Sequence, residues 1–202
     1  MFINSKNKFK VMPAKTSEVT RIRLKHKGKI HLKNFYVMMH EWLIHEGWAS
    51  RDDKNFPEIF SGRNDAAGGG SEIWWFWRPK KRMNSFFEWQ MDINGHVLTL
   101  RDIEEIKDGK KFKTNFGDVE IWIKVKLVLD PDDKWANHPF LKNFLGVYIK
   151  RMRKKDISNH QKGLLKEAYR FQDAMKSFMG LITANKEIEH QGRFFPEGGI
   201  GE

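Results

Sequence analysis

The sequence of 202 residues contains no cysteine, and this absence excludes disulfide bonds, thiolate metal sites and thiol nucleophiles. No apolar run is long enough to cross a bilayer, and no hydrophobic signal-peptide segment follows Met1. We therefore expect a cytoplasmic protein without a membrane span. A chain of this length can bury a proper hydrophobic core within one domain.

Common motifs of catalysis and cofactor binding are missing as well. There is no P-loop, no Gly-x-Gly-x-x-Gly and no Gly-x-Ser-x-Gly. His40 and His45 lie about 140° apart around a helix, whereas a zinc-protease motif needs two histidines on one face. The acidic cluster Asp130, Asp132 and Asp133 lacks the glycine and the terminal glutamate of an EF-hand. The sequence therefore predicts no metal site and no cofactor.

Aromatic side chains, by contrast, are abundant and concentrated in one segment. Residues 73–77 read Ile-Trp-Trp-Phe-Trp, between a run of three glycines and Arg78-Pro79. This pattern predicts a strand, and because side chains alternate along a strand, both of its faces are aromatic. One face is expected to enter a core. The other needs a helix, a partner, a ligand or a base stack to cover it.

The formal net charge of +11 is concentrated near the N-terminus. Residues 1–33 carry ten Lys or Arg side chains and one acid, Glu18, so this segment accounts for +9 of the total. A basic segment is typical of a polyanion partner such as RNA, DNA or an acidic surface. A Lys-rich edge can also simply keep a protein soluble and block edge pairing. The sequence leaves both interpretations open.

Hydrophobic periodicity predicts an α+β fold, in which a curved antiparallel meander sheet is packed by an N-terminal helix and two C-terminal helices. The domain is expected at residues 19–183, between a basic extended arm at 1–18 and a C-terminal tail at 184–202. A half-buried strand is predicted at 20–27, and a helix at 32–46 that ends at Gly47.

The middle of the chain is predicted to form the meander, after a long connection at 50–71. The predicted strands are 72–78, 86–93, 96–106 and 118–130, with hairpin turns at Asn94-Gly95 and Asp108-Gly109. The predicted C-terminal helices run from Phe140 to Met152 and from a capping box at Ser158 to Gly180.

Trp75 and Trp77 are expected in the core, whereas Trp74, Phe76 and Trp122 are candidates for a stacking surface or an interface. Beside basic residues such as Lys124 and Lys126, together with Phe86, they could form a platform for single-stranded nucleic acid. Alternatively, the three predicted helices could cover both sheet faces and turn these aromatics into a second core layer.

Candidate polyanion-binding residues come from three basic segments: the first strand, the turn after Pro79 and the end of the first C-terminal helix. They are Arg21, Arg23, Lys25, Lys27, Lys29, Lys80, Lys81, Arg82, Arg151, Arg153 and Lys154. Lysine outnumbers arginine in the N-terminal segment, which favours contact with a phosphate backbone, or plain solvation, over readout of bases.

Asp92 followed by Glu105-Ile106-Lys107 is similar in outline to the acid…acid-x-Lys layout of restriction-endonuclease-like nucleases. There, two carboxylates would hold Mg²⁺ and the lysine would support the attacking water. A solvated charged face is the competing interpretation.

Taken together, the sequence favours a non-catalytic binding or assembly protein that associates with nucleic acid or another polyanion through its basic arm. One alternative is a pocket protein that holds an apolar small molecule between helix and sheet, beside Trp75, Trp77, Phe87 and Trp89. The metal-dependent nuclease is the other. A protein partner or self-association is also compatible with the aromatic strand.

Overall fold

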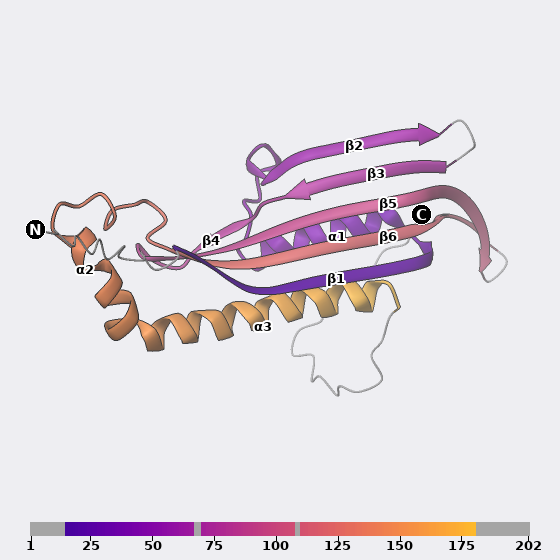
Figure 1. The fold of residues 1–202 in the computed structure, drawn as a ribbon. Coiled ribbons are helices and arrows are strands. Elements are labelled where there is room, and N and C mark those ends of the chain that lie inside the picture. The colour runs from indigo at the N-terminus through magenta and orange to yellow at the C-terminus, as the bar shows by residue number, and fades with distance from the viewer. Residues whose placement is uncertain (1–14, 67–69, 108–109, 181–202) are drawn as a thin grey trace, which may run out of the picture.

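The computed structural model describes residues 15–66, 70–107 and 110–180. They form one antiparallel sheet and its helices (Figure 1). In chain order the elements are β1 (Thr16–Ile30), α1 (Leu32–His45), the 3-10 turn η1 (Asp53–Asn55), β2 (Glu58–Ala66), β3 (Gly70–Trp77), β4 (Lys80–Arg82), β5 (Phe87–Lys107), β6 (Lys110–Leu129), α2 (Leu141–Val147), the π-helical turn η2 (Tyr148–Met152) and α3 (Lys154–Phe178).

The strand order is β1-β6-β5-β3-β2, and the short β4 pairs with β5 beside β3. All pairings are antiparallel, and β1 joins the sheet by pairing with β6, the last strand of the chain. The long strands β5 and β6 bend along their length (Figure 1). The predicted fold class is therefore confirmed: a curved antiparallel sheet with one N-terminal helix and two C-terminal helices.

Helices α1 and α3 both pack on one face of the sheet, which we call the helix-covered face. Tyr36 of α1 lies with its ring centroid 5.9 Å from that of Trp75 and 4.9 Å from that of Trp77. His160 of α3 lies 4.2 Å from the ring of Phe87. The two helices also contact each other, as in the ring pairs Phe35–Phe178 and Trp42–Phe171, at 5.5 and 4.6 Å.

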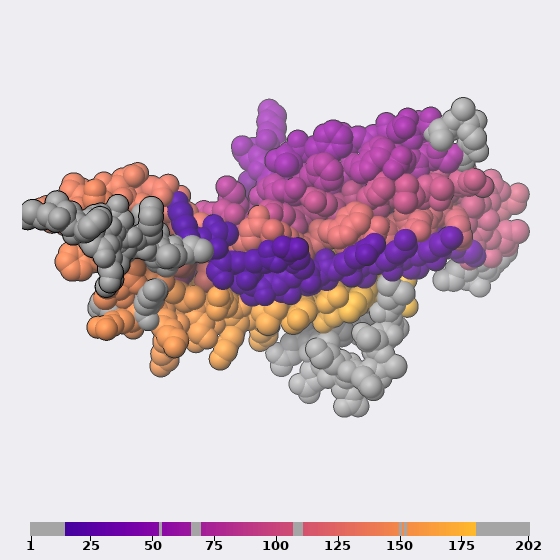
Figure 2. Space-filling view, viewed as in Figure 1, coloured from indigo at the N-terminus to yellow at the C-terminus, as the bar shows by residue number. Residues whose placement is uncertain are grey.

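The opposite side, which carries Trp74, Phe76, His96 and Trp122, is the helix-free face. Figure 1 is viewed onto this side, so that the strands pass in front of α1, while α3 runs along β1. The space-filling view from the same direction shows the strands themselves forming the surface (Figure 2).

The core lies between the sheet and the two helices. Trp75 and Trp77 are 1% and 0% exposed, which confirms the expectation that they are core residues. The side chains of β6 that alternation places on the inward face are all buried, namely Val119, Ile121, Ile123, Val125, Leu127 and Leu129. The buried residues of α3 recur at helical spacing and form one apolar stripe, namely Leu164, Ala168, Phe171 and Met175.

The predicted hairpin turn at Asn94-Gly95 is wrong, because β5 continues through it without interruption. Asn94 pairs with both Phe76 and Trp122, and Gly95 with both Trp75 and Ile121, so the two residues lie in the middle of the sheet. A Cβ atom at Gly95 would overlap the indole of Trp75. The glycine is therefore required by close packing and not by a turn.

Other boundaries also differ from prediction. The predicted connection at 50–71 contains β2, which pairs with β3 along its length. The predicted helix from Phe140 to Met152 is split into α2 and η2, and α3 begins at Lys154 and not at Ser158. The predicted turn at Asp108-Gly109 and most of the predicted arm and tail fall outside the described residues, although residues 16–18 belong to β1.

Candidate functional site

Five rings gather on the helix-free face and form what we call the aromatic patch: Phe60, Trp74, Phe76, His96 and Trp122. Sheet register explains the cluster, because these residues occupy two neighbouring cross-strand rows. One row runs Phe60, Phe76, Asn94, Trp122 and Arg23, from β2 to β1. The other runs Gly62, Trp74, His96, Glu120 and Lys25.

The rings of the patch stack on one another across the strands. Trp74 and His96 lie 5.3 Å apart with planes 10° from parallel, and His96 lies 6.4 Å from Trp122 at 20°. Phe60 and Phe76 form a second stack at 5.2 Å. Glu72 lies 2.7 Å from Nε2 of His96 and so helps to orient the central ring.

The patch is open to solvent to different degrees. Phe60 is 47% exposed and Trp122 is 36% exposed, whereas Trp74 and Phe76 are half-buried. Since α1 and α3 both lie on the other side, the hypothesis that the chain's own helices cover the second aromatic face is wrong for these residues. It holds only for Phe86, which is buried against Trp135 and Tyr148.

Cations of β1 border the patch on one side. The Arg23 guanidinium lies 5.8 Å from the ring of Trp122, and Arg23 also pairs with Glu120. Lys25 lies 3.3 Å from a carboxylate oxygen of Asp118. The cationic side chains are 64% and 54% exposed but their partners only 11% and 18%, so the carboxylates lie near the sheet and the cations extend beyond them.

The same arrangement continues along β1. Arg21 binds Glu18 through two contacts, and these hydrogen bonds lower the pKa of the Glu18 carboxyl to about 2, with Lys124 contributing. Lys29 lies 2.9 Å from Glu105, at the far end of the sheet. Arg21, Arg23, Lys25 and Lys27 all face the helix-free side, because they pair with the outward residues of β6.

The opposite border of the patch is formed around Arg78. Its guanidinium lies 5.9 Å from the ring of Phe76 and donates a hydrogen bond of 2.7 Å to the carbonyl of Trp77. It also approaches Asp92 to 3.7 Å, and Asp92 pairs with Lys126 of β6. This border is therefore a network of paired charges.

The three predicted basic residues of β4 divide between the two faces. Lys80 and Arg82 pair with the outward residues Gln90 and Glu88, and Arg82 also binds Asp132. Lys81 faces the helices, where its Nζ lies 2.9 Å from Glu167. The third basic segment lies apart from both, at the junction of η2 and α3. There Arg151 and Lys154 are exposed, and Arg153 binds Asp156 at 2.6 Å.

The structure does not bring Asp92 and Glu105 together. Both belong to the continuous strand β5, and at about 3.3 Å per residue the length of strand between them is about 40 Å. They pair with different cations, Lys126 and Lys29. Lys107 ends the strand, and its side chain is not among those described. Within the described ranges no three His, Asp or Glu side chains are placed to hold a metal ion.

The residues expected to line an apolar pocket are packed into the core. Trp75, Trp77, Phe87 and Trp89 are at most 5% exposed and belong to one cluster with α1 and α3. One surface hollow of about 450 Å³ touches Phe87 and Trp89 beside the start of α3.

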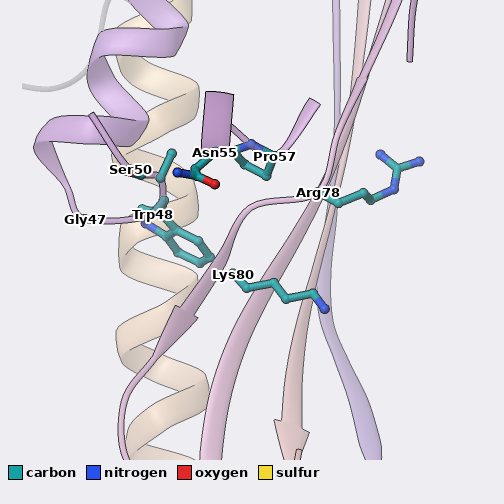
Figure 3. A pocket seen from close by; sticks show the side chains of 8 residues that line it. Gly47, Trp48, Ser50, Asn55, Pro57, Arg78 and Lys80 are labelled. Atoms are coloured by element: carbon teal, nitrogen blue, oxygen red, sulfur yellow. The ribbon is translucent and has the colours of Figure 1, made fainter. Parts of the chain in front are cut away.

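Another hollow, of about 380 Å³, lies beside Trp48 and Pro57 (Figure 3). The side chains of Arg78 and Lys80 extend away from Trp48 there, so they do not converge on a common point (Figure 3).

Sequence reasoning missed three residues at this site: Phe60, Asn94 and His96. Phe60 lies in the segment predicted as a connection, and the predicted turn at Asn94-Gly95 interrupts the strand that carries the other two. Alternation from Asp92 through Asn94 to His96 would have placed both beside Trp122, had the Asn-Gly pair not been interpreted as a turn.

No helix in the described ranges is long and apolar enough to span a membrane. Neither a protein-family model nor a curated protein matches the chain. Among solved structures, it is similar to a protein from Rhizobium leguminosarum described as uncharacterized, with a TM-score of 0.19 and 6% identity over 83% of this chain and 97% of that chain. A similarity of this degree supports no conclusion about fold or function.

Proposed function

We propose that this protein binds single-stranded nucleic acid on the helix-free face of its sheet. Bases would contact the aromatic patch, and phosphates would contact the cations of β1. The observation that carries the proposal is the position of Trp122, which is 36% exposed in the middle of the uncovered face, with Arg23 beside its ring.

The geometry of β1 supports contact with a nucleic-acid backbone. Arg21, Arg23, Lys25 and Lys27 alternate with inward residues, so successive cations are about 6–7 Å apart along the strand. This spacing is comparable to that of phosphates in an extended single strand. The row runs beside the patch, so one strand could place its backbone on β1 and its bases towards β6 and β5.

The ion pairs of β1 do not prevent such binding. The Arg23 and Lys25 side chains are more than half exposed, so water screens their attraction to Glu120 and Asp118 although these carboxylates lie close to the sheet. Since the cations extend beyond their carboxylates, a phosphate can approach them from solvent. Base stacking on aromatic side chains then adds binding free energy that does not depend on sequence.

The test is fluorescence anisotropy with a labelled 20-mer of deoxythymidine, at 50 and 200 mM salt. We expect binding that weakens steeply with salt, and a loss of about tenfold in affinity for Trp122→Ala. Phe112→Ala removes an exposed ring of β6 outside the patch and should leave the affinity unchanged.

Two further measurements separate the contributions. An abasic oligomer of equal length and charge should bind more weakly than the thymidine oligomer. Its affinity should be the same for Trp122→Ala and for Phe112→Ala. Because β1 begins at Thr16, the arm can be tested by removing residues 1–14 without shortening the sheet. We expect this truncation to reduce both affinity and salt slope. Absence of binding at 50 mM salt would overturn the proposal.

A further inference from the structure

Helix α2 exposes an apolar stripe at one end of the molecule. Phe140, Phe144 and Val147 are 75%, 63% and 52% exposed, and Phe140 is the most exposed large apolar side chain in the described ranges. Their spacing of four and three residues places them on one side of the helix. No residue of α2 is fully buried, and only Leu145 of this helix packs against the edge of the core.

The segments on either side of α2 are fixed to the sheet. Trp135 and Tyr148 stack at 4.3 Å, and each contacts the buried ring of Phe86, at 5.7 and 5.6 Å. Arg153 donates a hydrogen bond of 2.6 Å to the Tyr148 hydroxyl. The stripe is therefore held out beyond the end of the sheet by an ordered support (Figure 1).

The surroundings of the stripe are basic. Residues 134–155 contain seven Lys or Arg side chains and no acid. Lys142, Arg151, Lys154 and Lys155 are exposed. The acids that flank this segment in the sequence are Asp132, Asp133 and Asp156, and they are engaged by Arg82, Lys15 and Arg153.

The charge of each candidate partner indicates whether it can bind this basic and apolar surface. A second copy would bring the same basic surface against itself in a two-fold contact. The residues before Lys15 carry Lys6, Lys8 and Lys10 without an acid, so the arm is repelled as well. A nucleic acid would contact the cations and could stack bases on the two phenylalanines, but the aliphatic Val147 offers it no stacking surface. An anionic lipid surface satisfies both features, since apolar side chains enter the acyl region while cations contact headgroups.

We propose that α2 and the junction of η2 with α3 form a docking site for anionic lipid bilayers. This binding is peripheral: the Phe140, Phe144 and Val147 side chains enter the interface, and Arg151, Lys154 and Lys155 contact the headgroups. The site is separate from the aromatic patch and does not depend on nucleic-acid binding there.

The test is co-sedimentation of the full chain with vesicles of phosphatidylcholine alone or with 30% phosphatidylserine. We expect clear binding to the anionic vesicles, at least about tenfold stronger than to the neutral ones, since each basic residue near an anionic surface strengthens the binding. The double variant Phe140→Ser/Phe144→Ser should lower the affinity for anionic vesicles about tenfold or more. The triple variant Arg151→Glu/Lys154→Glu/Lys155→Glu should abolish the preference for phosphatidylserine.

Ile59→Ser is the matched control, because Ile59 of β2 is 65% exposed but lies away from α2. It should bind like the parent protein. Each variant should keep the thermal unfolding midpoint of the parent protein, and the double variant should keep its affinity for the thymidine oligomer. These results would show that the losses of vesicle binding are local. Unchanged vesicle binding by the double variant would overturn the proposal. So would a dimer that this variant abolishes, or vesicle binding that appears only after removal of residues 1–14.

Discussion

Trp74 and Trp75 are neighbours in β3, yet they belong to opposite faces with different physical roles. Trp75 is 1% exposed and contacts Tyr36 of α1, while the backbone of Gly95 passes beneath its indole. Trp74 is half-buried and stacks on His96, and neither α1 nor α3 covers it. The two faces of one aromatic strand therefore cannot be distinguished by composition. What separates them is where the helices pack.

The two faces also contribute unequally to the free energy of folding. The helix-covered face is held by apolar burial, which contributes most of the stabilisation in a domain of this size. The helix-free face is held by cross-strand ring stacks and partly exposed ion pairs, each of which contributes much less to stability. Changes on the two faces should therefore have unequal effects on stability, and this inequality can be measured.

The largest difference in the free energy of unfolding is expected between the variants Trp75→Ala and Trp74→Ala. The first leaves a large cavity in the core and should lower the free energy of unfolding by about 3–5 kcal/mol. The second removes a cross-strand stack at a half-open surface and should cost about 1 kcal/mol. Urea unfolding of both variants provides the measurement. Equal losses would mean that the helix-free face is buried in solution, for example by self-association.

Glycines opposite the same two tryptophans give a second, smaller contrast. A Cβ atom at Gly95 would overlap the Trp75 indole inside the core, so Gly95→Ala should cost about 3 kcal/mol. A Cβ atom at Gly62, opposite Trp74, would come within 2.9 Å of the Phe60 ring tip, which can move into solvent. Gly62→Ala should therefore cost less than about 1 kcal/mol. Thermal unfolding of the pair would show whether this order holds.

At Gly95 the local sequence pattern predicts the wrong structure. The inward residues of β6 and the stripe of α3 could be predicted, because a period of two or of 3.6 residues reports burial directly. Asn94-Gly95 carries the strongest local signal for a hairpin. Only the tertiary position of the Trp75 indole explains why a strand needs glycine there.

The aromatic patch was only partly predictable for a similar reason. Trp74, Phe76 and Trp122 could be assigned to the outward faces of strands from alternation. Whether helices cover that face depends on how α1 and α3 share the sheet, and each helix pattern alone is equally compatible with either side. Phe60 and His96 enter the patch through strand register, which no local pattern specifies.

Two glutamates that each contact two donors extend the comparison to charged groups. Glu167 on the helix-covered side accepts hydrogen bonds from Trp48 Nε1 at 2.7 Å and from Lys81 Nζ at 2.9 Å. Glu167→Ala leaves both donors without this acceptor and should cost about 2 kcal/mol, with Glu167→Gln partly restoring stability. Glu18 contacts Arg21 and Lys124 in solvent, so Glu18→Ala should change stability little. Urea unfolding at pH 7.5 would contradict this contrast if the two alanine variants were equally unstable.

The smallest effect is expected in the pH dependence of stability, which should differ between a titrating group on the helix-covered face and one on the helix-free face. Burial against Phe87 lowers the pKa of His160, although Asp156 acts in the opposite direction. The unfolded chain then binds more protons below about pH 6.5, so stability falls as the pH decreases through this range. The Glu18 carboxyl, with its pKa lowered to about 2, loses its contribution only as the pH falls below about 4.5. Between pH 7.5 and 5.0 the parent protein should therefore lose more stability than His160→Phe. A variant that loses as much as the parent would show that His160 is solvated and that the helix-covered face opens beside the start of α3.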